Sequence, residues 1–374
     1  MIRKLLAALA LAAAGAASAQ GVTDSTILLG QSVALTGPAQ QLGLDMRLGA
    51  SLYFDQVNAR GGVNGRKIVL KTLDDGYEAT RAAENTRKLI NEERVFALFG
   101  YVGTPTSQAS LPIFTEARVP FVGPFTGAEL LRTPVNPYIF NVRASYWDET
   151  EAIVQHLTAM SVNKIAVFYQ NDAYGLAGLT GVERALKKRG LEIVAKGTVE
   201  RNTVEVKKAI EEINKVQPQA VVMISAYKSC AAFIKEMKKA GANPTFWNVS
   251  FVGSKALAKE LDKEGRGVQI SQVVPFPWDG SVPVVKEYQR LLAENAKGEQ
   301  PGFGTLEGYI AAKVMVEGLR RAGRNLTRDG FIRAMETIQD YDVGGFKVTF
   351  GPGRRSGSQF VDLTIISKDQ KFVR

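Results

Sequence analysis

Residues 220–225 read AVVMIS, an apolar run that ends on serine, and this run indicates the class of fold. A strand that is apolar at every position needs cover on both faces, as in a parallel sheet between two layers of helices. Outward from this run, the sequence predicts helices over 206–216 and 229–240 and a strand over 245–249. This order of elements predicts an α/β fold built on a doubly wound parallel sheet.

The same alternation of short apolar runs and helical spacing continues in both directions along the chain. One series of elements precedes Tyr146 and a second series follows it. Further strands are expected at 27–29, 67–73, 95–99, 119–122, 164–169, 191–194, 346–350 and 361–366. Further helices are expected at 44–59, 78–93, up to Ala117, around 153–157, and at 284–296, 306–322 and 331–338. Two consecutive series predict two doubly wound parallel-sheet lobes.

The length of the chain agrees with two lobes. At 374 residues it exceeds what one compact core usually holds. The last third has too few expected strands for a third domain and is expected to divide between the lobes. The N-terminal lobe is predicted to hold 20–145 with about 273–352, and the C-terminal lobe 146–272 with about 353–374. Several short segments would then connect the lobes, as at a hinge.

Residues 1–19 have the pattern of a secretory signal peptide. Arg3 and Lys4 precede an apolar run of about ten residues, which leads to small residues ending at Ala19. The run is too short to span a bilayer, and no later segment reaches the required length. Cleavage is expected near Ala19, and the mature chain is expected to be exported without inserting into a membrane.

Charge and rare residues exclude several classes of function. Lys and Arg outnumber Asp and Glu by 47 to 37, but the excess is spread along the chain, which favours solvated helix faces over a nucleic-acid site. The chain has one His and one Cys. These counts exclude His-based triads, HExxH helices and multi-Cys/His zinc sites. No nucleic-acid partner, metal or cofactor is therefore expected.

Residues with catalytic potential do not form a recognisable constellation. There is no GxSxG or Walker motif, and residues 302–308 have the wrong spacing for a dinucleotide fingerprint. Asp74 and Asp75 are interpreted as a strand-end pair that caps the following helix, and His156 as a surface residue. Cys230 lies at a helix start, where its pKa could fall, but no His is near it in sequence. We expect a protein that is not an enzyme.

Two loops that leave neighbouring strands could hold an anion. Ligands of open parallel sheets lie outside the carboxyl ends of the strands. The first loop carries Tyr101 and Thr104 and leads into a helix, and the second carries Phe125 and Thr126. Backbone N–H groups at a helix N-terminus, together with threonine hydroxyls, predict a site for a carboxylate or other anion. The alternative is a helix cap without a ligand.

The second series of elements offers three further loops at the same edge of its sheet. They carry the candidate residues Tyr174, Ala226, Tyr227 and Ser250. The two tyrosines could cover a small ligand with a ring and a hydroxyl, and ordinary half-buried packing is the alternative.

The motifs resemble those of a known family when they are taken in order. They are a signal peptide, ALTGPAQQLG, NARGGVNGRKI, TLDDGYEATRAAENTRKLI, FGYVGTPTSQA, RVPFVGPFTGAELL, YQNDAYG and EGYIAAKVMVEGL. The chain resembles the periplasmic solute-binding proteins of ABC importers, in the branched-chain amino-acid (Leu/Ile/Val) binding group. This resemblance covers essentially the whole mature chain. It implies a type I periplasmic-binding fold, with two lobes, a three-segment hinge, and a ligand enclosed between the lobes.

The resemblance also implies roles for individual residues. The ligand carboxylate would be held by Thr104 and by the backbone and hydroxyl of Phe125-Thr126, which is the anion site inferred above from residue types. The aromatic contact of the second lobe would fall on Ala226 or Tyr227, and Tyr174 would line the cleft.

The sequence departs from the family pattern at the partner for a ligand ammonium. That acidic residue aligns with Ser250, and the aromatic cap of the side-chain pocket aligns with Leu42 or Gln41. A buried ammonium without an anionic partner costs several kcal/mol. An α-amino acid would therefore bind poorly unless another carboxylate, such as Asp172 or Glu307, reaches the cleft.

We expect a periplasmic binding protein for a small carboxylate-bearing solute, with an aromatic or other organic acid as the first candidate and an amino acid as the second. The expected partners are the membrane subunits of an ABC permease. Two alternatives remain open. One is a soluble sensory ligand-binding module, and the other is a secreted hydrolase that uses Asp74 with Asp75 or Asp172 with Glu307.

Overall fold

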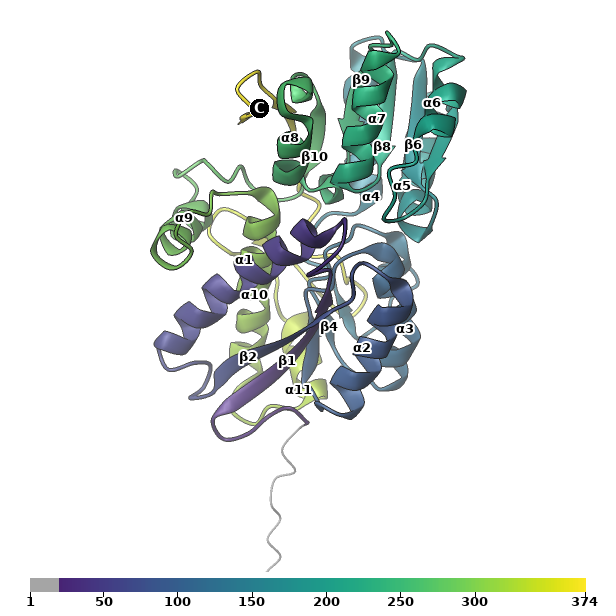
Figure 1. Cartoon of the computed structure of the whole chain (residues 1–374). Helices are drawn as coiled ribbons and strands as arrows, with labels where there is room; N and C mark the ends of the chain where they lie inside the picture. Colours follow the sequence, from purple (N-terminus) through teal and green to yellow (C-terminus); the bar gives the residue numbers. More distant parts are fainter. Residues whose placement is uncertain (1–19) are drawn as a thin grey trace, which may run out of the picture.

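The computed structural model describes residues 20–374, so the predicted signal peptide lies outside the described residues. The chain forms two lobes, one built mainly from the first part of the sequence and one from the middle part, as Figure 1 shows. Each lobe contains one large sheet with helices on both faces. The α/β class with two lobes, predicted from the sequence, is confirmed.

The sheet of the first lobe is parallel throughout and has the strand order β2-β1-β3-β4-β5. Its strands are β1 (Thr26–Val33), β2 (Lys67–Asp74), β3 (Ala97–Phe99), β4 (Phe121–Val122) and β5 (Ile139–Phe140). The helices of this lobe are α1 (Gln40–Ala59), α2 (Ala79–Asn91), α3 (Thr104–Glu116), α9 (Pro283–Asn295), α10 (Phe303–Ala322) and α11 (Arg328–Glu336). Helix α1 packs on α10, and α2 packs on α3 at the opposite face (Figure 1).

The sheet of the second lobe has the order β14-β13-β10-β9-β8-β6-β7. The five strands from β10 to β7 are parallel, whereas β13 and β14 run antiparallel at one edge. Its strands are β6 (Ile165–Gln170), β7 (Lys196–Val199), β8 (Ala220–Ile224), β9 (Thr245–Asn248), β10 (Gln269–Gln272), β13 (Asp362–Ile366) and β14 (Phe372–Val373). Its helices are α4 (Tyr146–Ala159), α5 (Ala173–Lys187), α6 (Lys207–Asn214), α7 (Tyr227–Lys239) and α8 (Ser254–Leu261).

Three segments run between the two sheets. They are 141–145 after β5, 273–282 after β10, and 349–361 between β13 and the small hairpin of β11 (Tyr341–Asp342) and β12 (Lys347–Val348). The first and third of these segments lie side by side where residue 141 bridges residue 356. These connections support the lobe ranges inferred from the sequence, which we retain as a proposal.

One expectation about the second sheet is corrected. The strand expected at 191–194 is a loop, and the edge strand is β7, where Gly197 and Val199 are buried while Lys196 and Thr198 face solvent. Leu191 and Ile193 are half-buried and pack against the hydrophobic core, which explains their apolar character.

Strand β10 and helix α8 were not expected from the sequence. Strand β10 reads QISQ and therefore lacks a continuous apolar run. Its polar side chains are buried because they find partners: the Gln272 amide donates to Thr364 at 2.9 Å, and the Ser271 hydroxyl donates to Glu149 at 2.6 Å. Buried polar groups paired in this way are compatible with a central strand but hide it from a search for apolar runs.

Asp74 and Asp75 fix the loops at the end of β1 and β2. Asp74 accepts hydrogen bonds from the Thr36 hydroxyl at 2.6 Å and from the Leu35 N–H at 2.8 Å, and Asp75 accepts one from the Tyr77 N–H at 2.8 Å. Burial acts to raise the pKa of Asp74, but these hydrogen bonds outweigh it and lower that pKa to about 2. Burial raises the pKa of Asp75 to about 6. Both carboxylates therefore hold the loops in place.

Replacing Asp74 with asparagine is expected to lower the free energy of unfolding at pH 7 by about 1–2 kcal/mol, because charge-assisted hydrogen bonds are lost. A carboxylate with a lowered pKa stabilises the fold above its unfolded pKa, and this contribution disappears as the pH falls toward 2. In urea unfolding, the difference in the free energy of unfolding between the unchanged protein and Asp74→Asn should be smaller at pH 3 than at pH 7. The exposed Asp24 provides the matched control, Asp24→Asn. A difference that is independent of pH would contradict this role.

Candidate ligand-binding site

The two threonines predicted to hold an anion lie side by side. Thr104 is the first residue of α3, and Thr126 follows β4, where residue 102 bridges residue 125. Their Oγ1 atoms are 2.7 Å apart, and the Thr126 hydroxyl is within 3.3 Å of the Tyr146 hydroxyl. Both threonines are completely buried. In this arrangement the hydroxyls therefore bind each other.

A buried arginine occupies the first connection between the lobes. The Arg143 guanidinium donates to Glu149 at 2.6 Å and to Glu307 at 3.3 Å, and it also binds the Ser250 hydroxyl. Its charged group lies 5.6 Å from the ring centres of both Phe125 and Tyr146. Arg143 and Glu149 were not predicted from the sequence. Arg143 follows β5, a two-residue strand that was not expected, and Glu149 belongs to none of the recognised motifs.

The two carboxylates around Arg143 have different environments. Glu149 accepts from the Ser250 N–H at 2.7 Å and from the Ser271 hydroxyl at 2.6 Å, in addition to Arg143. Glu307, from the second turn of α10, binds Arg143 and no other residue among 20–374. Burial raises the pKa of Glu307 to about 7, although Arg143 opposes this shift. Burial disfavours the charge on Arg143, but the two carboxylates outweigh it and raise the pKa of that arginine.

A small hollow lies between the lobes beside this cluster. It has room for about one water molecule, about 10 Å³. Its lining is partly apolar and partly polar and comes from both lobes: Leu42, Asp45, Phe125, Ser250, Gly253, Ser254, Gln272, Val273, Val274, Phe303, Gly304 and Glu307. A solute larger than water can enter only when the lobes move apart.

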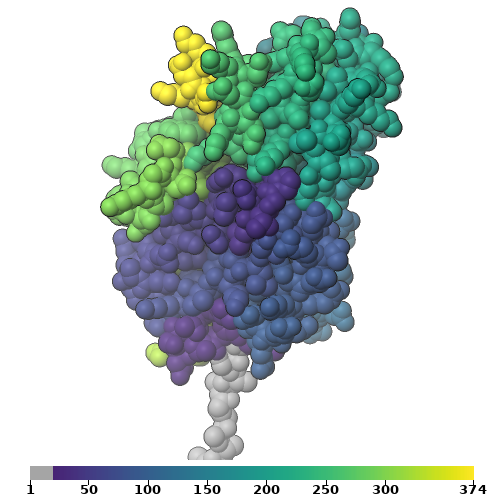
Figure 2. Space-filling view, in the orientation of Figure 1, coloured from purple at the N-terminus to yellow at the C-terminus, as the bar shows by residue number. Residues whose placement is uncertain are grey.

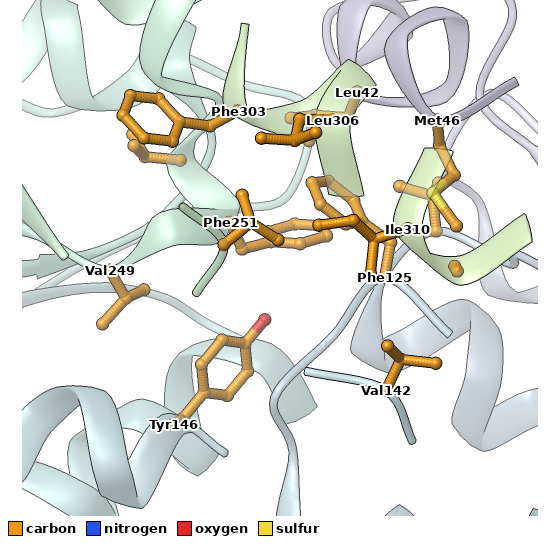
Figure 3. Close-up of a cluster of buried hydrophobic side chains, with 14 of the residues drawn as sticks. Leu42, Met46, Phe125, Val142, Tyr146, Val249, Phe251, Phe303, Leu306 and Ile310 are labelled. Atoms are coloured by element: carbon orange, nitrogen blue, oxygen red, sulfur yellow. The ribbon is translucent and has the colours of Figure 1, made fainter. Parts of the chain in front are cut away.

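Aromatic rings fill the rest of the space between the lobes. Figure 3 shows Phe251 at the centre of this cluster, beside Phe125, with the Tyr146 hydroxyl pointing toward it. The Phe251 ring centre is 5.5 Å from that of Phe125 and 4.7 Å from that of Tyr174. Tyr174 is completely buried, and its hydroxyl has no hydrogen-bond partner within residues 20–374. Such an unpaired hydroxyl is unusual in a folded interior.

The remaining predicted residues are distributed around the site. Tyr227 accepts a hydrogen bond from the Gln41 N–H of the other lobe at 3.4 Å. Ala226 precedes α7 as its N-cap and is half-buried. Tyr101 lies elsewhere: its hydroxyl is 3.0 Å from the Thr86 hydroxyl, and its ring packs in the smaller core cluster behind the sheet.

The lobes are in contact along their boundary, as Figure 2 shows on one face of the molecule. The Glu78 carboxylate binds Arg201 at 2.9 Å and Asn202 at 2.6 Å across the gap. The Gln170 amide donates to the Tyr77 hydroxyl at 3.3 Å. The structure therefore represents a closed arrangement of the two lobes.

Residues 26–370 match the sequence model of the family described as periplasmic binding protein. The chain belongs to this family. Among curated relatives, the "Leu/Ile/Val-binding protein homolog 7" of Brucella abortus (strain 2308) is 27% identical over 371 residues, which cover 94% of this chain and 90% of the relative. The resemblance to the branched-chain amino-acid binding group, predicted from the motifs, is confirmed.

Solved structures of similar proteins have the same fold as this periplasmic binding protein. A possible leucine/isoleucine/valine-binding protein from Rhodopirellula baltica SH 1 is 34% identical, with a TM-score of 0.90 over 94% of this chain and 97% of that chain. A fatty acid ABC transporter substrate-binding protein from Thermomonospora curvata is 23% identical, with a TM-score of 0.87 over 95% of this chain and 92% of that chain. The predicted type I periplasmic-binding fold is confirmed.

Three groups that the sequence offered for catalysis, Cys230, His156 and Asp172, lie in surroundings typical of structural residues in this periplasmic binding protein. Burial raises the pKa of Cys230, although its place at a helix start could have lowered it, because the thiol lies inside the core. His156 is exposed, and its ring packs on Trp247. Asp172 caps α5 by accepting from the Tyr174 N–H at 2.9 Å. Within residues 20–374, no three His, Cys, Asp or Glu side chains gather closely enough to hold a metal ion.

Across residues 20–374, no helix combines the length and the apolar character that crossing a bilayer requires.

Proposed function

We propose that this protein captures a small carboxylate-bearing solute between its lobes and delivers it to the membrane subunits of an ABC permease. The solute would be an amino acid or an aromatic or other organic acid. The protein would act in the periplasm after removal of the signal peptide near Ala19, and it would catalyse no reaction. The observation that supports this proposal most directly is the Thr104–Thr126 hydroxyl pair at 2.7 Å, because Phe125, the residue before Thr126, lines the inter-lobe hollow.

The hydroxyl pair would change partners when a solute binds. In the described structure Thr104 and Thr126 bind each other, and this bond is a neutral one. A ligand carboxylate would accept from both hydroxyls and from N–H groups at the start of α3, and such charge-assisted bonds are roughly twice as strong. The unpaired Tyr174 hydroxyl would offer a further donor.

Population shift would couple binding to the closed form. Only contacts that the solute makes in the closed arrangement and lacks in the open one can shift the equilibrium toward the closed form. The Glu78–Arg201 ion pair across the gap is partly exposed, so it contributes little to closure by itself. A micromolar dissociation constant corresponds to about −8 kcal/mol, which a few charge-assisted bonds and buried apolar surface can supply.

Replacing Thr104 with valine is expected to weaken solute binding about tenfold, because one donor to the carboxylate is lost while the shape is nearly unchanged. The test is calorimetry on the mature protein after its bound solute has been removed by unfolding and refolding. The titrant is the small molecule that co-purifies with the protein, identified by mass spectrometry.

Thr180→Val is the matched control for this measurement, because Thr180 is exposed on α5 and lies outside the site. An affinity unchanged by Thr104→Val would remove Thr104 from the site. A co-purifying molecule without a carboxylate would contradict the proposed class of solute.

A further inference from the structure

Residues 372–374 connect the edge of the second sheet to one of the segments between the lobes. Phe372 and Val373 form β14, which pairs with β13 at that edge. Neighbouring side chains of a strand point to opposite faces, and Val373 is 44% exposed whereas Phe372 is 8% exposed. The Phe372 ring stacks on Trp278, with ring centres 5.6 Å apart and planes 19° apart. Since Trp278 belongs to segment 273–282, this stacking joins the second sheet to that segment.

A residue of the first lobe completes this contact. Phe303 is the first residue of α10, which packs on α1. Its ring lies edge-on to Phe372 and to Trp278, with ring centres 5.6 Å and 5.7 Å apart. Edge-to-face pairs at such separations are a favourable arrangement of aromatic rings. Phe303, Trp278 and Phe372 therefore form a three-ring cluster in which the two lobes are in direct contact.

Arg374 adds charged contacts beside the three-ring cluster. Its guanidinium lies 4.9 Å from the ring centre of Phe276, which belongs to the same segment as Trp278. It also binds Asp279 of that segment and Asp362 of β13, each at 3.4 Å. These ion pairs are partly exposed, and pairs of this kind contribute little by themselves. The rings therefore provide most of the stabilisation that this contact can give.

The three-ring cluster reaches the inter-lobe hollow through Phe303. Phe303 lines the hollow, whereas Phe372 and Trp278 are not among its lining residues. Phe303 also belongs to the buried hydrophobic cluster of Figure 3. Because Phe303 is fixed to the first lobe and Phe372 to the second, a rotation of one lobe against the other would change the distance between their rings.

We propose that Phe372 is a positioning residue that holds Phe303 and Trp278 together in the closed arrangement and thereby slows release of the solute. This inference rests on the proposed function and adds a determinant of the release rate that lies outside the hollow. Contacts made in the closed form and lost in the open form shift the equilibrium toward the closed form. Separated rings would also expose apolar surface to water, which favours the closed form further.

The association rate should depend little on the three-ring cluster. A solute enters the open form, in which Phe372 and Phe303 are apart. The solute leaves only after the lobes have opened, which breaks this contact. Loss of the Phe372 ring should therefore speed dissociation and leave association nearly unchanged.

The test replaces Phe372 with alanine in the full mature protein. Stopped-flow measurements give the two rates for the small molecule that co-purifies with the protein, identified by mass spectrometry. We expect the dissociation rate to rise about fivefold and the association rate to change less than about twofold, since loss of a contact acts mostly on dissociation. Phe372→Leu, which keeps an apolar side chain, should retain part of the slow release.

Two further variants assign the effect to the three-ring cluster. Val373→Ala is the matched control, because Val373 lies on the same strand and faces solvent, and it should leave both rates unchanged. Trp278→Ala should raise the dissociation rate as Phe372→Ala does. The double variant should release the solute no faster than either single variant, because both substitutions remove the same contact.

High salt separates the rings from the ion pairs between the lobes. The pair of Lys255 with Glu299 at 3.1 Å is partly exposed, and salt screens such pairs. At about 1 M NaCl, Phe372→Ala should still dissociate faster than the unchanged protein by the same factor, because apolar contacts are not screened. A factor that falls to one would assign the effect to the ion pairs of Arg374 and overturn the role of the rings.

The outcomes separate this inference from the proposed function. An unchanged dissociation rate in a folded Phe372→Ala protein that still binds the solute would overturn the inference and leave the proposed function intact. A slower association with an unchanged dissociation rate would also overturn it, because that result indicates a general disturbance of the site.

If no small molecule co-purifies, the proposed function loses its support, and the distance between the lobes tests the inference instead. Spin labels would be attached to Glu92→Cys after α2 and to Lys239→Cys on α7, which are exposed positions of the two lobes, while Cys230 is buried. Phe372→Ala should shift the population away from the distance of the closed arrangement. An unchanged distribution of distances would overturn the inference.

Discussion

Replacing Arg143 with methionine is expected to lower the free energy of unfolding by about 3–5 kcal/mol at pH 8, the largest effect that we expect from a single substitution. Arg143 is 1% exposed and is the only side-chain cation that contacts Glu149 and Glu307 in the described structure. Methionine fills a similar volume but leaves two buried carboxylates without a positive partner. Urea unfolding followed by circular dichroism measures the loss.

The loss should depend on pH. Burial raises the pKa of Glu307 to about 7, and removal of Arg143 raises this pKa further. A carboxyl with a raised pKa destabilises the fold once the pH rises through that value, and protonation at lower pH relieves the cost. The deficit of Arg143→Met should therefore be smaller at pH 5 than at pH 8.

Arg290→Met is the control for Arg143→Met. Arg290 forms an exposed ion pair with Glu294 at 2.7 Å on α9, and such pairs contribute little. We expect a change within about 0.5 kcal/mol. If Arg143→Met changed the free energy of unfolding as little as this control does, the cluster of Arg143 with its two carboxylates would not be what stabilises the connection between the lobes.

Replacing Gly308 with alanine is expected to destabilise the protein by about 3 kcal/mol, although the same change normally stabilises a helix. Helices α1 and α10 approach closely at this point: a methyl group at 308 would lie 2.4 Å from the carbonyl oxygen of Met46. One added at Gly49, on the facing helix, would lie 1.9 Å from the carbonyl oxygen of Thr305. Backbone cannot yield as a flexible side chain does, so the helices must separate.

Separation of these helices should also weaken binding of the solute. Residues 303, 304 and 307 line the hollow from α10, and residues 42 and 45 line it from α1. Thermal unfolding and calorimetry with the co-purifying solute provide the two measurements. Gly351→Ala is the control, because no atom lies within 4 Å of the added methyl group. Increased stability of Gly308→Ala would show that the helices can accommodate the methyl group at this point.

The adjacency of Thr104 and Thr126 could be predicted from the sequence. Both follow apolar runs that form neighbouring parallel strands, and the carboxyl ends of such strands meet at one edge. The buried strand β8 was equally clear, because AVVMI is apolar at every position. Strand β10 was missed because its glutamines and serine are paired inside the protein.

The Arg143 cluster could not be predicted in this way. Arg143 lies 164 residues from Glu307 and 107 residues from Ser250 along the chain. It also lies between a strand and a helix, where no periodicity constrains its environment. Glu307 was considered from the sequence only as one of several carboxylates that could reach the cleft.

The sequence alone determined the family, the two-lobed α/β architecture and the pair of hydroxyl-bearing loops, because each depends on local apolar patterns and on strand ends close in sequence. The tertiary structure alone decided the charge of the site. It brings Asp45, Arg143 and Glu307 from three distant segments to one inter-lobe space, and burial there makes the balance of their charges decisive. Charges interact most strongly where water is excluded, so this balance could be read only from the folded structure.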